Sequence, residues 1–258
     1  MKSFILLMKK ELENTKWPVL LFSFLTLLFH FILSTQAHRF PDIEVVIGLA
    51  CLPVVFIPLW LIWSGFQIYR TEWSHNTSYL LLSLPVSGIK ITTAKLLTLI
   101  LEFMALVGMM IAGLFIFLRQ QLYLALNVNT WFDELYIPWQ LVFSNAMMLF
   151  VVLLIGVVIL LMISQFVYIS SRFARRARGL VTVWVFVLTF WFTNKLAYLL
   201  EPLFRWMPAT SLTTITSTEG SYFLVKNQIV LSGEYSTLFV AIVLFILSSY
   251  LFERHIEL

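Results

Sequence analysis

A carboxylate, Glu102, stands well inside an apolar run, and Lys95 precedes it by seven positions. Seven residues make about two helical turns, so both side chains fall on one face of a helix, about 10 Å apart along its axis. An acid inside a membrane-spanning helix is costly unless it is paired or hydrated, and it often marks a function. Two interpretations are open: Glu102 meets a basic partner near the membrane boundary, or it takes part in substrate or ion binding.

The sequence lacks the common motifs of enzymes that act in membranes. It has no G-x-S-x-G, no H-E-x-x-H and no paired acids within one apolar run. Its histidines show no metal-ligand spacing and are expected to be interfacial or packed: His30, His38, His75 and His255. It also has no G-x-x-x-x-G-K-[ST] P-loop, so any ATP-driven work requires a second polypeptide. We therefore predict that the chain is not an enzyme and that it holds no metal and no cofactor.

The composition is that of a membrane protein. Of the 258 residues, 60% are hydrophobic and 12% are charged, whereas soluble domains are roughly half apolar and a quarter charged. The single cysteine, Cys51, excludes an intramolecular disulfide, and its place in an apolar run predicts that it is buried. The net charge of +4 comes from basic residues at the borders of apolar runs. They suit the head groups of a lipid bilayer better than nucleic acid.

Six uncharged windows approach the roughly 20 residues that a spanning helix needs. They cover approximately residues 17–35, 45–68, 96–118, 139–168, 180–199 and 235–252. The first is too long for a typical signal-peptide core and follows two acids, Glu11 and Glu13, so a permanent helix is favoured over a cleaved leader. The fourth window fits one tilted helix with an interfacial lead-in. The expected fold is an all-α integral membrane protein with six transmembrane helices, in which residues 1–258 form a single transmembrane domain.

Three further features of the chain carry structural expectations. Residues 1–16 are predicted to form an amphipathic helix in the membrane interface, and a cytoplasmic extension of the first span is the alternative. Residues 200–234 are too many for a structureless loop, so short helices or a small hairpin such as "SYFLVKNQIVLSG" are expected. Pro53 and Pro58 are expected to kink or loosen the second span.

Basic residues predict the orientation, because Lys and Arg are retained on the cytoplasmic side. With the N-terminus inside, 12 of the 17 basic residues are cytoplasmic and 5 lie outside. Both termini and the loop after the second span are then cytoplasmic, in a multi-pass protein of a bacterial plasma membrane. That loop contains "LLLSLPVS", in which residues 77–84 suit a short helix with an apolar face that Pro85 ends. Such a face suits a groove on a partner, although a plain membrane-surface connector is the alternative.

This loop resembles the cytoplasmic loop of type-2 ATP-binding-cassette permeases. The shared features are a glutamate soon after the second span, an apolar Leu-Pro turn, and Ile-x-x-x-Lys leading into the third span. The beginning "MKKELENTKW" is similar to the charged leading helix of the same family. The chain departs from the family at residues 73–77, where many members carry glycine.

The resemblance implies a coupling helix that docks into a separate nucleotide-binding ATPase subunit, which binds ATP and Mg. The working unit would contain two such ATPases and a second permease, identical or different. The residues expected to couple to the ATPase are Glu72, Tyr79, Leu80, Leu81, Leu84, Pro85 and Lys95.

Aromatic residues recur at helical spacing on the second and fifth spans. They include Phe56, Trp60 and Trp63 on the second span and Trp184 and Trp191 on the fifth. In the family these spans commonly border the path between two permeases, so the residues are candidates for lining a pathway. Lipid-facing aromatic belts are the alternative.

The leading hypothesis is therefore the permease subunit of an ATP-driven exporter that moves a peptide, lipophilic toxin or lipid-like cargo out of the cell. The alternative is an ATP-independent secondary transporter, or a membrane immunity or structural protein. Secondary transporters typically show discontinuous spans and several polar groups at mid-membrane, whereas this sequence offers one acid and no internal repeat.

Overall fold

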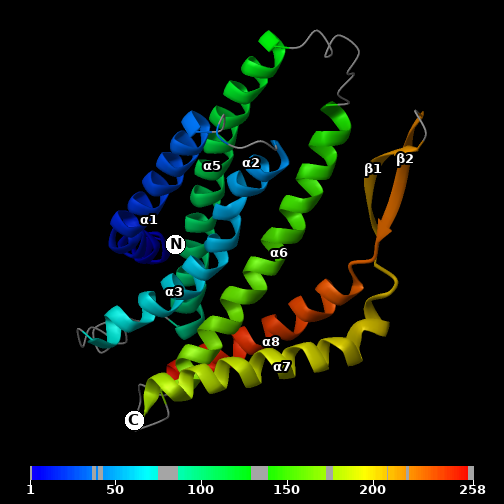
Figure 1. Cartoon of the computed structure of the whole chain (residues 1–258). Coiled ribbons are helices and arrows are strands. Elements are labelled where there is room, and N and C mark those ends of the chain that lie inside the picture. The colour runs from blue at the N-terminus through cyan, green and yellow to red at the C-terminus, as the bar shows by residue number, and fades with distance from the viewer. Residues whose placement is uncertain are drawn as a thin grey trace. The chain divides into compact units, whose positions relative to one another are not determined.

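The computed structural model describes residues 2–36, 39, 43–74, 87–128, 139–172, 177–207, 209–218 and 221–254. The chain divides into two compact units, Met1–Leu135 and Tyr136–Leu258. Figure 1 shows the elements of both units, and each unit is described by itself.

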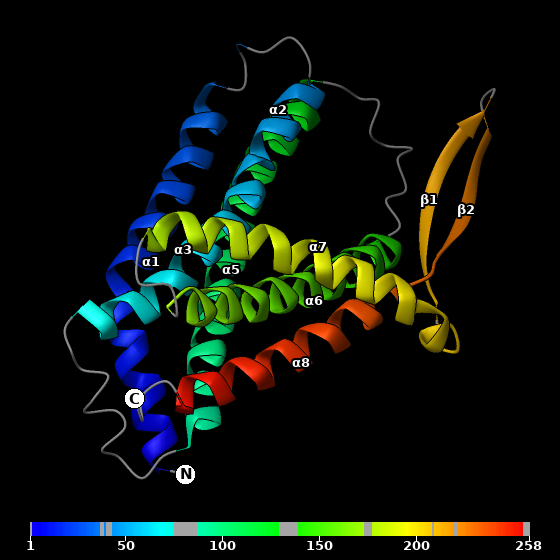
Figure 2. The same ribbon diagram turned by 90° about the horizontal axis from the view of Figure 1, so that it is seen from below.

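Unit 1 contains four helices in its described residues. They are α1 (Lys2–Gln36), α2 (Ile43–Ala50), α3 (Leu52–Ser74) and α5 (Gly88–Val128). Helix α1 packs along α5, and α3 packs against both of them (Figures 1 and 2). The face of α5 that points inward carries Ile91, Leu99, Phe103 and Leu106, which are almost fully buried. Their spacing of three to eight residues is that of one helical face, and this face forms the centre of the unit.

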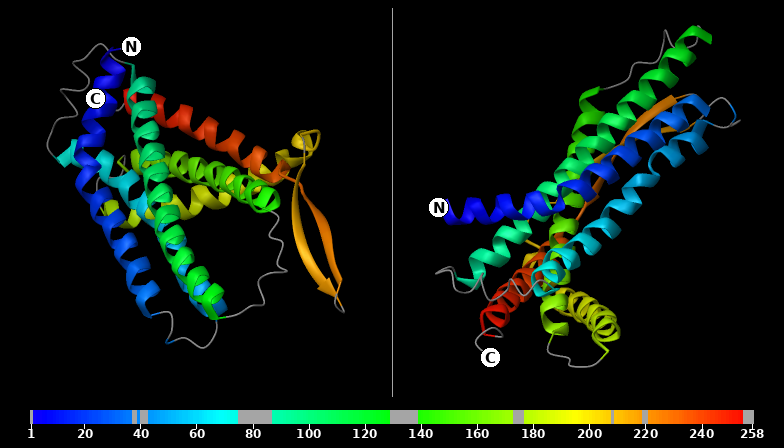
Figure 3. Two further views of the ribbon diagram at one scale, coloured as in Figure 1. Left: turned by 90° about the horizontal axis from the view of Figure 1, so that it is seen from above. Right: turned by 90° about the vertical axis from the view of Figure 1, so that its left-hand side faces the viewer.

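Helix α1 is unbroken over 35 residues, about 50 Å at the usual rise and longer than the roughly 30 Å hydrocarbon core of a bilayer. Residues 2–16 are thus continuous with the first span, as in the alternative of a helical extension, while their position in the membrane interface stays a prediction. Pro18 lies inside this helix, where proline removes a hydrogen bond and causes a bend. The right-hand view of Figure 3 shows the N-terminal turns of α1 running at an angle to the rest.

The second span is interrupted at Cys51, between α2 and α3. Pro53 has no N–H to continue the α2 ladder, but its ring suits the first turn of a new helix. The Val54 N–H donates to the Cys51 carbonyl at 3.0 Å in the intervening turn. The expected loosening thus occurs at Pro53, whereas Pro58 lies within the unbroken α3.

Cys51 is exposed at this interruption, so the prediction that it is buried is wrong. An apolar neighbourhood in a membrane protein does not predict packing, because the lipid-facing surface is apolar as well.

Unit 2 consists of α6 (Trp139–Ser171), α7 (Arg178–Phe204), β1 (Thr210–Thr218), β2 (Ser221–Ile229) and α8 (Ser232–Arg254). Helix α8 packs against α6 and α7, and α6 is a single helix as expected. The two strands form an antiparallel hairpin with Thr210 opposite Ile229 and Thr218 opposite Ser221. A hairpin was expected here, but "SYFLVKNQIVLSG" does not fold back on itself. It supplies β2, and the β-branched, threonine-rich segment 210–218 supplies the partner strand.

Within the described residues, six helices are long and apolar enough to cross a membrane. These spans are Phe4–Gln36, Gly48–Thr71, Gly88–Phe117, Phe143–Ser171, Gly179–Phe204 and Ser232–Glu253. They expose many large apolar side chains, among them Phe24, Phe115 and Leu188. Lipid accommodates such surfaces, and water does not. The chain is therefore an all-α, multi-pass membrane protein.

Candidate functional site

A buried ammonium group joins three helices of unit 1. Lys95 of α5 is fully buried, and its Nζ donates to Glu11 Oε1 of α1 at 3.1 Å. The same Nζ donates to the Ile68 carbonyl of α3 at 3.2 Å, and it lies 5.0 Å from the centre of the Tyr69 ring. Glu11 is only 1% exposed. Removing one partner of such a pair would leave the other charge buried and unpaired, which is strongly unfavourable.

This arrangement places Lys95 inside the bundle, not on a surface that a partner protein could touch. Lys95 was expected to couple to an ATPase, and its burial means that any such role is exerted through Glu11 and α3. It lies in the second turn of α5, which begins at Gly88, while Ile68 lies near the end of α3 at Ser74. The two helix ends that flank residues 75–87 are therefore tied together at one ammonium group.

Glu102 lies deeper on α5 and is 3% exposed. Ser64 of α3 donates to its Oε2 at 2.8 Å, and the Thr15 side chain of α1 lies beside the same carboxylate. Among the described residues, no group donates a hydrogen bond to its Oε1. The expected basic partner is not found there, because Lys95 pairs with Glu11 instead. Hydroxyl groups therefore solvate Glu102 in place of a cation.

The buried charges of the protein's described part all belong to this cluster. Apart from the His30 imidazole, its buried acidic and basic side chains are Glu11, Lys95 and Glu102. With both carboxylates ionised, the three groups carry one net negative charge. A buried charge without compensation is costly in a low-dielectric surrounding. A proton on one of the two carboxylates, or a bound cation, would remove this excess charge.

A pocket of about 110 Å³ adjoins the cluster between α1 and α3. It is called the polar pocket after its polar lining residues, although most of its open surface is hydrocarbon and aromatic. Its walls combine hydroxyl, amide, carboxylate and indole groups, from Glu11, Asn14, Thr15, Pro18, Trp60, Trp63, Ser64, Gln67, Ile68 and Thr71. Ser64 and Thr15 contact Glu102 on one side and line the pocket on the other. The Trp60 Nε1 group is buried and finds no hydrogen-bond partner among the described residues.

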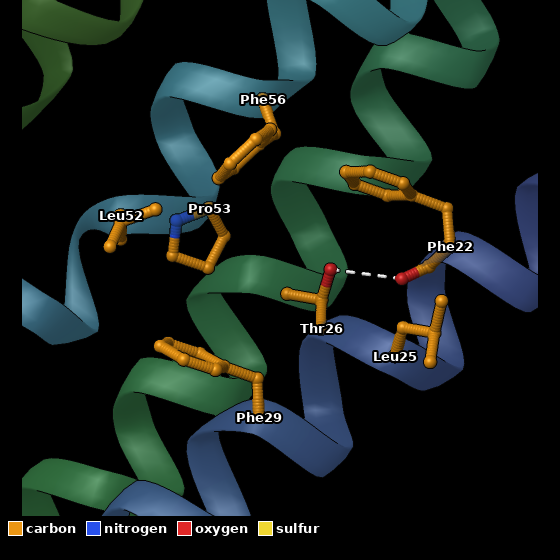
Figure 4. A pocket seen from close by; sticks show the side chains of 7 residues that line it. All are labelled: Phe22, Leu25, Thr26, Phe29, Leu52, Pro53 and Phe56. Carbon is orange, nitrogen blue, oxygen red and sulfur yellow. Dashed lines mark hydrogen bonds between the residues drawn. The ribbon is translucent and has the colours of Figure 1, made fainter.

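A second pocket, of about 170 Å³, lies between the same two helices and is apolar. Figure 4 shows its lining side chains, which are Phe22, Leu25, Thr26 and Phe29 of α1 and Leu52, Pro53 and Phe56 of α3. The Thr26 hydroxyl donates to the Phe22 carbonyl at 2.9 Å, so its polar group is already satisfied. The pocket therefore offers hydrocarbon and aromatic surface.

The aromatic candidates separate into two groups. Phe56 lines the apolar pocket, and Trp60 and Trp63 line the polar one. Trp184 and Trp191 lie on α7 in unit 2, each 59% exposed, and they line neither pocket. Their exposure agrees with the alternative of a lipid-facing belt, and a pathway role for them stays a prediction.

The other candidate residues lie at or beyond the end of α3. Glu72 belongs to its last turn, but its side chain is not described. Tyr79, Leu80, Leu81, Leu84 and Pro85 lie outside the described residues.

Three members of the site were missed in the sequence: Glu11, Thr15 and Ser64. Glu11 and Thr15 are four residues apart and so share one face of α1, which was a detectable signal. The packing of that face against Lys95 and Glu102 depends on tertiary structure.

Comparisons of the chain with protein-family models, with curated proteins and with solved structures found no match.

Proposed function

We propose that this chain is the membrane-spanning permease subunit of an ATP-driven exporter in a bacterial plasma membrane. The observation that carries the proposal is the contact of Lys95 with Ile68 and Glu11, because it ties both ends of the cytoplasmic loop to the first helix. Cargo would be a peptide, a lipophilic toxin or a lipid-like molecule.

Through this contact, a displacement of the loop would be transmitted to the spanning helices. A partner that binds residues 75–86 acts on the end of α3 and on the start of α5 at once. Since Lys95 bonds to both α3 and α1, the three helices move together instead of the loop deforming alone. Chains of packed and hydrogen-bonded elements can carry energetic coupling between distant sites.

The energy source is a separate subunit. The sequence has no P-loop of its own, so ATP and Mg bind to a nucleotide-binding partner. The apolar side chains of "LLLSLPVS" supply a surface that a hydrophobic groove on that partner would bury. A second permease, identical or different, completes the working unit, and this chain itself catalyses no reaction.

A second candidate is an ATP-independent secondary transporter. Two observations favour it: the interruption of the second span at Cys51 and the buried carboxylate of Glu102 beside a polar pocket. Proline-interrupted spans and intramembrane acids are typical of substrate and ion sites in such transporters.

Purification of the tagged chain from its native membranes in mild detergent distinguishes the two candidates. An exporter subunit should elute with a P-loop ATPase and with vanadate-sensitive ATP hydrolysis. Elution of the chain without any ATPase, combined with transport driven by an ion gradient in liposomes, would support the secondary transporter instead.

A further inference from the structure

The two pockets of unit 1 lie end to end along one seam between α1 and α3. On α1 the seam passes from Glu11 through Thr15 and Pro18 to Phe22, Thr26 and Phe29, at the three- and four-residue spacing of a single helical face. On α3 the order is reversed, from Gln67 through Ser64 and Trp60 to Phe56 and Pro53. The Phe22 and Trp60 rings meet between the two pockets, with centroids 5.1 Å apart.

The two ends of this seam differ in chemistry. One end is lined by amide and hydroxyl residues and by two indole rings, and Glu102 lies behind Ser64. The other presents leucine, proline and phenylalanine side chains. Thr15 and Thr26 lie 11 positions apart, about 17 Å along the helix. The seam therefore has the length and polarity of a molecule with a small polar head and a hydrocarbon chain.

The charge of the cluster indicates the sign of the head. Glu11 is already paired with Lys95, whereas Glu102 has only hydroxyl partners and one oxygen that accepts no hydrogen bond in the described part. The indole rings of Trp60 and Trp63 add faces that attract cations. A pocket of 110 Å³ has about the volume of three or four water molecules in the liquid, enough for an ammonium group and its first carbons.

We propose that this seam binds an amphiphile whose head is a primary ammonium group. The head occupies the polar pocket at Ser64, behind which Glu102 lies, and the hydrocarbon chain passes over the Phe22 and Trp60 rings into the apolar pocket. That this amphiphile is cargo rests on the proposed function, whereas the binding itself does not.

Titration of the purified protein in phosphatidylcholine nanodiscs tests the proposal without any ATPase. The probes are dodecylammonium, dodecanol and butylammonium. Calorimetry measures their binding, and the signal from empty nanodiscs is subtracted. We expect saturable binding of dodecylammonium to the wild type, with dodecanol at least tenfold weaker. Glu102→Gln should raise the Kd for dodecylammonium tenfold or more, whereas Glu102→Asp should retain binding. Glu13→Gln is the matched control, because it neutralises an exposed acid on α1.

A variant of the apolar end separates head recognition from chain recognition. Leu25→Trp fills the apolar pocket from an exposed position. It should therefore weaken the binding of dodecylammonium and leave the binding of butylammonium unchanged.

Equal affinity for dodecylammonium and dodecanol, or an unchanged Kd in a folded Glu102→Gln protein, overturns the proposal. So does a tightly held phospholipid, detected by native mass spectrometry, that blocks every probe. Binding that persists in a protein that never associates with an ATPase contradicts the proposed function alone.

Discussion

The Lys95 ammonium lies 3.1 Å from Glu11 Oε1, although 84 residues separate the two in the chain. This pair fixes the N-terminal turns of α1 to the start of α5 inside unit 1. It also explains why Lys95, in the second turn of α5, is fully buried.

Breaking the pair from one side should destabilise the protein strongly. Lys95→Met leaves the Glu11 carboxylate buried without a cation, and we expect a loss of about 3–5 kcal/mol in the free energy of unfolding. Denaturant unfolding in detergent, followed by circular dichroism, measures it. Lys9→Met, at an exposed position of α1, should change stability by less than about 0.5 kcal/mol. Replacing both partners, in Glu11→Leu with Lys95→Met, should recover much of the loss, and no recovery would refute a direct interaction.

The close approach of α1 and α5 at Gly113 yields a second prediction. An added Cβ would lie 2.8 Å from His30 Nδ1. The two His30 ring nitrogens lie 2.8 Å from the Thr26 carbonyl oxygen and 3.0 Å from that of Ala50, so the ring has little room to move. Gly113→Ala should therefore cost about 1–3 kcal/mol in stability.

Gly108 on the same helix is the matched control, since a Cβ there meets nothing within 4 Å. Gly108→Ala should be neutral or stabilise the helix by up to about 1 kcal/mol. Equal effects of the two substitutions on the melting temperature would rule out the packing argument.

The orientation in the membrane is testable with single cysteines. In a Cys51→Ser background, which is needed because Cys51 is exposed, we expect Asn76→Cys and Ala177→Cys to be cytoplasmic and Ser217→Cys to lie outside. The charge distribution supplies the reason. A membrane-impermeant thiol reagent applied to intact cells should label only the cysteine at position 217. Labelling at position 76 from outside would reverse the topology.

The six spans could be predicted because length and apolar composition suffice to define them. The interruption at Cys51 could be anticipated only in part: Pro53 indicated a weak point, but not whether the helix would bend or end there. Prediction failed where partners are distant in sequence. Lys95 and Glu102 share one face of α5, which suggested a common role, yet Lys95 pairs with Glu11 and Glu102 with Ser64. Such pairings depend on how α1 and α3 rotate against α5, and a spacing within one helix does not specify that.

The most direct test of the proposed coupling is the effect of loop substitutions on the association with the ATPase. Loss of a buried Leu contact costs about 2 kcal/mol, enough to weaken docking tenfold or more. Leu81→Asp and Leu84→Asp should therefore leave the six spans inserted but abolish both co-purification of the nucleotide-binding subunit and cargo-stimulated ATP hydrolysis. Ser83→Asp, which adds the same charge to the loop without removing an apolar side chain, should retain both. If the two leucine variants bind and stimulate the ATPase as the wild type does, residues 75–87 do not couple this protein to an ATPase.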